Sequence, residues 1–241
     1  MKKHTKTIVA VSLAVAAALA LVGVIVQTAG GGVDVVATQS IASFQAVLKA
    51  IPDQVRADDE HGGWVLRSPD GEASFFWSRD FAHSARYDVM LTWDAAPFRN
   101  AGLDVTKLPA EYTAYAGMLM LGTKLGNSAL AYSGEATPIA SYEKLVASYP
   151  AVLNYHMAMD HFGVKVGNGN LFEWARNLTA NTATQTAQDQ DMVFVLLNPE
   201  PLIAAGVDPA KVEGWDYTQV EVMQNNATVK VYRFLKSYHI G

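Results

Sequence analysis

Two acid-histidine pairs are the residues of this sequence best suited to chemistry. Glu60 and His61 precede one strand-like stretch, and Asp160 and His161 precede another, with His156 four residues before Asp160 on a segment we expect to be helical. Imidazole nitrogens and carboxylate oxygens are the ligands that zinc and similar metals take in proteins. If two related units met at a two-fold axis, His61, His161, Glu60 and Asp160 would converge on one divalent ion. The alternative is that they are polar residues at the entry to a strand.

A Trp-x-Arg pair follows each acid-histidine pair. Trp77 and Arg79 form the first, and Trp174 and Arg176 form the second. An aromatic and cationic surface of this kind is suited to binding a carbohydrate or a peptide. The same spacing also occurs where a tryptophan fills the core and the arginine spreads its apolar stem over it. The sequence leaves both interpretations open.

Other catalytic signatures are missing. The chain has no Gly-x-Ser-x-Gly, no P-loop, no Gly-x-Gly-x-x-Gly and no cysteine, so the common nucleophile and nucleotide motifs do not apply. Without the three lysines near its start it has 15 basic and 23 acidic residues, a net charge of −8. We expect no nucleic-acid partner, because such binding relies on clustered Lys and Arg. The sequence names no cofactor beyond the metal considered above.

The start of the chain resembles an export signal. Lys2, Lys3 and Lys6 precede an apolar run over residues 8–26. A run of 19 residues exceeds the roughly 7–15 of a cleaved signal and fits the roughly 17–25 of a membrane span. We expect a single-pass anchor with the rest of the chain outside the cytoplasm, since positive charge stays inside. The alternative is cleavage near Gly30 and secretion.

The remainder of the chain contains a tandem repeat of about one hundred residues. Three matches occur in the same order, at offsets of 98, 97 and 104. They pair residues 41–44 with 139–142, residues 77–81 with 174–178, and residues 97–108 with 201–212. Collinear matches at a nearly constant offset indicate an internal duplication, so we expect residues 38–135 and 137–241 to superpose.

Each copy shows the pattern of an amphipathic helix, a hairpin, a strand, a short connector and another hairpin. This order predicts an α+β fold of two tandem repeats, each a helix packed on an antiparallel sheet, after an N-terminal hydrophobic helix. The modules resemble the broad cystatin-like and NTF2-like architectures, a likeness that carries no function by itself. The expected divisions are residues 1–30, 31–136 and 137–241.

These features favour an extracytoplasmic binding or interaction protein, held in the membrane through residues 8–26 or secreted. Its ligand would be a protein or a small molecule bound at the groove or faces between the repeats. Two alternatives stay open. One is an exported hydrolase with a site between the repeats, and the other is an accessory subunit of a bacterial cell-envelope complex.

Overall fold

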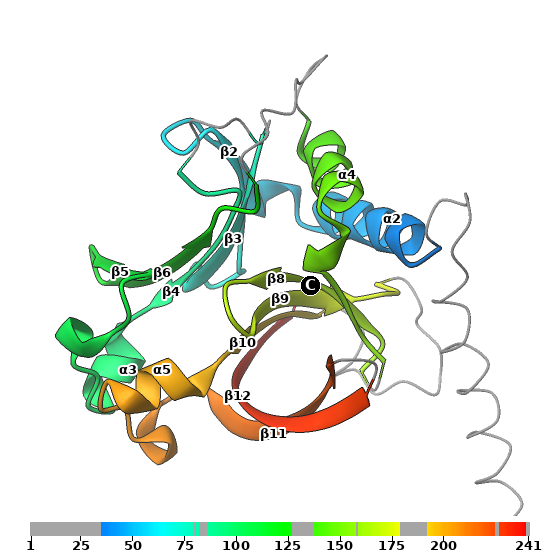
Figure 1. Cartoon of the computed structure of the whole chain (residues 1–241). Coiled ribbons are helices and arrows are strands. Elements are labelled where there is room, and N and C mark those ends of the chain that lie inside the picture. The colour runs from blue at the N-terminus through cyan, green and yellow to red at the C-terminus, as the bar shows by residue number, and fades with distance from the viewer. Residues whose placement is uncertain are drawn as a thin grey trace, which may run out of the picture.

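A computed structural model shows two antiparallel sheets and a layer of two helices (Figure 1). It describes residues 35–79, 81, 86–126, 137–157, 159–178, 192–224 and 227–239. The apolar run at residues 8–26 lies outside these ranges. Among the residues described, no helix is both long enough and apolar enough to cross a membrane.

Both repeats have the same succession of elements. The first comprises α2 (Val35–Ala50), η2 (Pro52–Gln54), β1 (Val55–Asp58), β2 (Gly63–Arg67), β3 (Ala73–Ser78), β4 (Val89–Asp94), α3 (Ala96–Asn100), η3 (Val105–Lys107), β5 (Tyr112–Tyr115) and β6 (Met118–Thr123). The second comprises α4 (Pro138–Ser148), η4 (Pro150–Val152), β7 (Leu153–His156), β8 (His161–Val166), β9 (Asn170–Ala175), β10 (Met192–Leu197), α5 (Pro199–Ala204), η5 (Pro209–Lys211), β11 (Asp216–Gln224) and β12 (Ala227–His239).

The two sheets also have the same strand order. The first runs β1-β2-β3-β4-β6-β5 and the second β7-β8-β9-β10-β12-β11. Trp77 lies fifth in β3, opposite Val89, and Trp174 lies fifth in β9, opposite Val193. The predicted α+β fold with two tandem sheet-and-helix units is therefore confirmed, and the matched tryptophans occupy equivalent places.

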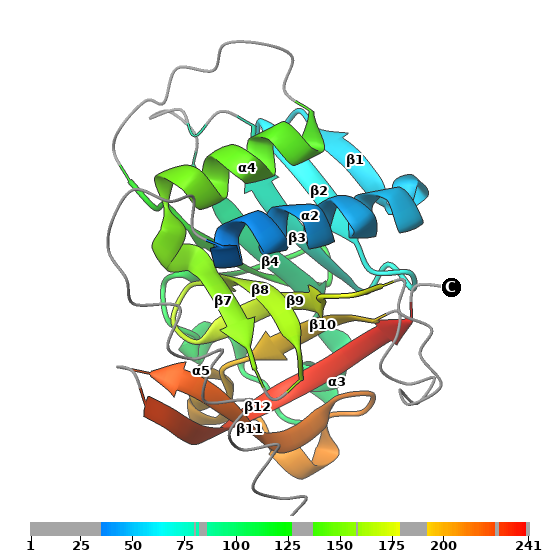
Figure 2. The ribbon, with the colours of Figure 1, turned by 90° about the vertical axis from the view of Figure 1, so that its right-hand side faces the viewer.

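Each helix packs on the sheet of the other repeat. Helix α2 lies beside α4 and contacts β8 and β9, whereas α4 contacts β3 (Figure 2). Equivalent serines connect each helix to the sheet of the other repeat by a hydrogen bond. Ser141 Oγ donates to Ser78 O at 2.6 Å, and Ser43 Oγ donates to Ala175 O at 3.3 Å. The rings of Phe44 in α2 and Tyr142 in α4 also lie 5.3 Å and 5.8 Å from Trp77 and Trp174 of their own sheets, so each helix packs between both sheets.

Matched aromatic residues meet where the repeats face each other. The rings of Phe75 and Phe172 stack at 4.8 Å, and those of Phe44 and Tyr142 lie 4.2 Å apart. Both pairs consist of equivalent positions of the two copies, as expected along a pseudo-two-fold axis. All four side chains are fully or almost fully buried in one apolar cluster that spans both repeats. The space between the repeats is therefore core.

The connectors after β4 and β10 join across the same axis. Asp104 N donates to Ala205 O and Asp208 N donates to Ala101 O, both at 2.8 Å. Each aspartate also caps the short helical turn that follows it. The shared residues of the connectors thus hold the two repeats together.

The repeats differ in the length of their last hairpin. Strands β11 and β12 have 9 and 13 residues, whereas β5 and β6 have 4 and 6. The longer hairpin curls around until β11 approaches β7, so the second sheet encloses its own inner face (Figure 1). That face carries a separate small apolar cluster, which consists of Leu171, Phe194, Leu196 and Val220.

Candidate functional site in the second sheet

The two tryptophans predicted as binding residues lie in the core. Trp77 and Trp174 are both 0% exposed. The Nε1 of Trp77 donates to Pro138 O at 3.1 Å, and that of Trp174 donates to Ser43 Oγ at 2.9 Å. Each indole thus hydrogen-bonds the helix of the other repeat, and neither ring is available to stack on a ligand.

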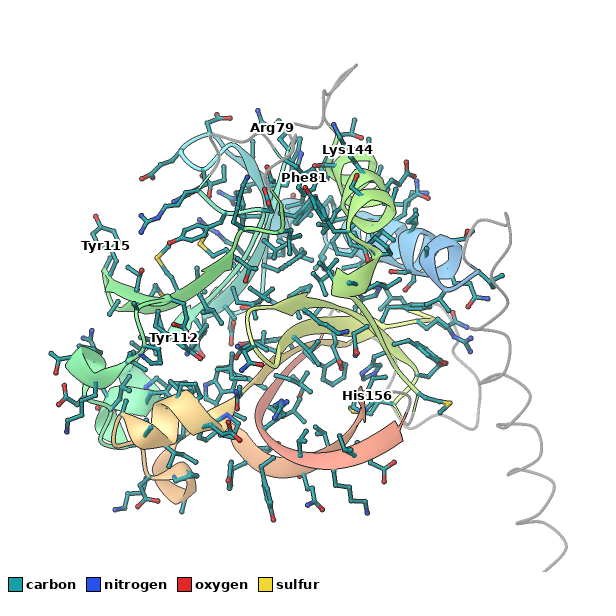
Figure 3. All side chains as sticks on the ribbon, in the orientation of Figure 1. Arg79, Phe81, Tyr112, Tyr115, Lys144 and His156 are labelled. Atoms are coloured by element: carbon teal, nitrogen blue, oxygen red, sulfur yellow. The ribbon has the colours of Figure 1, made fainter. Side chains whose placement is uncertain are left out.

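The two arginines fasten hairpin turns. Arg79 Nη2 donates to Asp59 Oδ1 at 3.0 Å, and its guanidinium lies 5.1 Å from the Trp64 ring centroid (Figure 3). Arg176 Nε lies 2.9 Å from Asp160 Oδ1. These contacts favour the structural interpretation of both Trp-x-Arg pairs, in which tryptophan fills the core and arginine ties down the preceding turn.

The four predicted metal ligands are not brought together. His61 Nδ1 pairs with Asp58 Oδ2 at 2.9 Å, and Glu60 is exposed. Asp160 accepts a hydrogen bond from the Tyr155 hydroxyl at 2.5 Å besides its pairing with the arginine. Across the described part of the chain, no group of three or more His, Asp or Glu side chains is arranged to hold a metal ion.

Strand register explains why the predicted set does not converge. His161 lies opposite Ala175, and Gly63 lies opposite Ser78, the equivalent of Ala175. The counterpart of His161 is therefore Gly63, so the matched acid-histidine pairs are two residues out of register. Equivalent positions approach only near the axis, which runs through the core and not through these hairpin entries.

A different set of ionisable side chains does gather, on the inner face of the second sheet. His156 Nδ1 lies 3.3 Å from Glu173 Oε2, and His161 Nδ1 lies 3.7 Å from the same oxygen. Asn154 Nδ2 donates to Glu173 Oε1 at 3.3 Å. Figure 3 shows His156 pointing into the interior that β8 to β12 surround. We call these four residues the Glu173 cluster.

Three neighbouring strands present the cluster. Alternate residues of a strand point to the same face, so β7 supplies Asn154 and His156, while β8 and β9 supply His161 and Glu173. Gly163, opposite Glu173, makes room: a Cβ there would lie 2.7 Å from Glu173 Cγ. Because β7 is a strand, the expectation of a helix around His156 is wrong.

The cluster is buried and incompletely hydrogen-bonded. Glu173 is 0% exposed, and the two histidines are 4% and 3% exposed. His161 Nδ1 has no hydrogen-bond partner, although its ring stacks on Phe194 at 4.2 Å. Burial by itself raises the pKa of Glu173, but the hydrogen bond from His156 and the electrostatic attraction of His156 and His161 outweigh it and hold the pKa below its usual value. Glu173 is therefore an ionised carboxylate in the interior.

The first repeat has no carboxylate and no imidazole at the positions of Glu173 and His161, although Asp58 and Arg56 correspond to His156 and Asn154. Phe76, opposite Met90, is the counterpart of Glu173, and Gly63 is the counterpart of His161. The Phe76 ring fills the space above Gly63, where an added Cβ would lie 2.2 Å from it. The same strand arrangement thus forms without a carboxylate at this position of the sheet.

Sequence reasoning missed Glu173, but a signal was present. It stands between Phe172 and Trp174, where the aligned copy reads Phe75-Phe76-Trp77. A charged residue that replaces an apolar one within a matched, buried strand indicates a role other than packing.

Comparison with protein-family models, with curated proteins and with solved structures finds no match. A function can therefore be inferred only from the arrangement of the side chains.

Proposed function

We propose that this chain is an extracytoplasmic binding protein, tethered to the membrane through residues 8–26, which takes a small ligand into the interior of the second sheet. Strands β7 to β9 would form one wall of the site, with β10 beside them and the curled β11–β12 hairpin opposite. The apolar run and its flanking lysines support the tether.

One observation carries the binding proposal: the Glu173 cluster exists in only one of two equivalent sheets. Removing a carboxylate from water costs several kcal/mol, which imperfect partners do not fully recover. Phe76 occupies the same place in the first repeat, so the architecture does not require this cost. A costly feature that the fold can omit is best explained by a role in binding.

The composition of the inner face supports the same proposal. Ligand sites in proteins are mostly apolar and contain a few well-placed polar groups. Here Leu171, Phe194 and Leu196 form an apolar wall, and the Glu173 cluster supplies the polar groups at one end of it. Curled sheets that enclose their inner face hold small ligands in the same way.

Hydrogen–deuterium exchange of the full chain in lipid nanodiscs tests the location of the site. We expect benzylamine or benzyl alcohol, added at millimolar concentration, to slow exchange in peptides from β7 to β12 and to leave β1 to β4 unchanged. Slower exchange confined to the first sheet or to α2 and α4 would contradict the proposal, and so would no change anywhere.

The first repeat provides a variant for the same experiment. The double substitution Glu173→Phe and His161→Gly installs the residues of the equivalent positions, and His161 must be removed because the ring needs the space that Gly63 leaves for Phe76. We expect this variant to fold and to lose the effect of the probe. A full effect in the folded variant would place the ligand elsewhere.

A further inference from the structure

The geometry of the Glu173 cluster points to the class of ligand. We infer that the ligand carries a compact cationic head with several N–H donors, which lies between Glu173 and His161, and a small apolar body beside Phe194. The inference rests on the proposed function and specifies the chemistry of its site.

The carboxylate has unused capacity to accept hydrogen bonds. A carboxylate can accept about four, and hydrogen bonds that involve a charged group are usually about 2.7–2.9 Å long. The polar groups around Glu173 lie at 3.3 Å (Asn154), 3.3 Å (His156) and 3.7 Å (His161). These long contacts leave the oxygens poorly satisfied, which is costly for a buried charge.

The imidazole of His161 has the same deficiency. Its Nδ1 is buried without a hydrogen-bond partner and lies on the side of the ring nearest Glu173 Oε2. A neutral imidazole accepts through one nitrogen, so a donor group beside Oε2 could serve both residues. A primary ammonium has three N–H donors and meets this requirement, whereas a carboxylate has none.

Charge favours a cation at this end of the interior. Two basic side chains, Lys165 and Arg233, lie on the same face of the sheet. Lys165 is exposed and lies opposite Leu171, and Arg233 Nη1 donates to the carbonyl of Tyr232. Asp160, at the turn before β8, is already paired with Arg176. Glu173 thus supplies an interior negative charge. His156 and His161 balance it only when they are protonated, so attraction to a cation is strong where water is excluded and the imidazoles are neutral.

The apolar residues next to the cluster define the rest of the ligand. Phe194 lies opposite Glu173 in β10, and Leu171 is two residues from Glu173 along β9 on the same face. A head bound at Glu173 would therefore place an attached ring or short chain against these two side chains. Both are at least nine-tenths buried, so the body must be small and these side chains must move apart to admit it.

Three molecules of nearly equal size test the inference: benzylamine, protonated at neutral pH, benzyl alcohol and benzoate. Calorimetric titration of the full chain in nanodiscs gives a Kd for each. We expect benzylammonium to bind at least about tenfold more tightly than benzyl alcohol, because it is charged and has three N–H donors, whereas the alcohol is neutral and has one O–H donor. We expect benzoate to bind most weakly.

Variants separate the cluster from general charge effects. Glu173→Gln should remove the preference for benzylammonium. Glu221→Gln, which removes one negative charge from the outer face of β11, should retain it. His161→Phe keeps the ring stacked on Phe194 and removes the unpartnered nitrogen, so it should fold well and reduce the preference.

The possible outcomes distinguish an error in the ligand class from an error in the proposed binding site. Equal Kd values for benzylammonium and benzyl alcohol, with exchange still slowed in β7 to β12, would overturn the ligand class and leave the site in place. A preference that survives Glu173→Gln would also overturn it. Absence of binding by all three molecules would overturn both the class and the proposed function.

Discussion

The contact between Gly102 and Gly206 is a sensitive test of how the two repeats are joined. Both residues have positive φ, +106° and +104°. A Cβ added at Gly102 would lie 2.7 Å from the carbonyl oxygen of Gly206, and a Cβ at Gly206 would lie 2.8 Å from that of Gly102. The obstacle is backbone in each case, so no side-chain rotation relieves it.

We predict that Gly102→Ala lowers the free energy of unfolding by about 3 kcal/mol. Alanine at positive φ costs about 1 kcal/mol, and forcing the connectors apart adds about 2 kcal/mol, in the range found for overpacked cores. Gly71→Ala is the matched control, because Gly71 has φ +75° and a Cβ there would meet nothing within 4 Å. Gly71→Ala should lower the free energy of unfolding only by the roughly 1 kcal/mol that alanine costs at positive φ.

Urea unfolding of the chain in mild detergent, followed by tryptophan fluorescence, measures all of these values. Gly206→Ala should match Gly102→Ala, and the double variant should cost less than the sum, because either methyl group already opens the shared contact. The reasoning is refuted if Gly102→Ala and Gly71→Ala agree within about 0.5 kcal/mol, the size of ordinary surface effects.

Three further predictions concern other parts of the molecule. Ser43→Ala should destabilise the chain by about 2 kcal/mol and Ser141→Ala by about 1 kcal/mol, because only Ser43 accepts from a tryptophan; equal losses in urea unfolding would contradict this. The pKa of Glu173 is lowered on folding, so its ionisation stabilises the chain above the unfolded pKa of about 4.3, and this contribution is lost as the pH falls through the folded value. The stability of the wild type relative to Glu173→Gln should therefore fall below about pH 4, and a relative stability that rises on acidification would show the opposite sign. The chain should stay in the membrane fraction after carbonate washing with its full intact mass; a species that begins near Gly30 would show that residues 8–26 belong to a cleaved signal.

The sequence was sufficient to predict the elements and their repetition. Ile41 and Ile139 lie in equivalent helices, and the strand expected before each connector forms as β4 and β10. Hydrophobic periodicity reports that a face is buried, but it does not report what covers that face. The exchange of α2 and α4 between the sheets could therefore not be predicted from the helices themselves.

The site was harder to predict because β9 is buried on both faces. All six residues from Asn170 to Ala175 are buried, so no alternation assigns Glu173 to either side of the sheet. The visible acid-histidine pairs suggested a symmetric metal site, which the register does not assemble. The feature that distinguishes the second sheet is a departure from symmetry, and it becomes apparent only when the strands are paired residue by residue.

The exchanged helices bear on how such a site could arise. A chain with a single repeat would lack the second helix and sheet that complete this core unless a second copy supplied them, so the closed form of one repeat is a two-fold dimer. In such a dimer any substitution appears twice. A carboxylate at the position of Phe76 and Glu173 would then burden both sheets with the cost of a buried charge. Joining the copies in one chain removes that constraint, because the first sheet can keep its phenylalanine while the second acquires Glu173 and a longer hairpin to enclose it. The asymmetry is therefore the part of this molecule that the symmetric fold cannot account for, and it lies where we place the ligand.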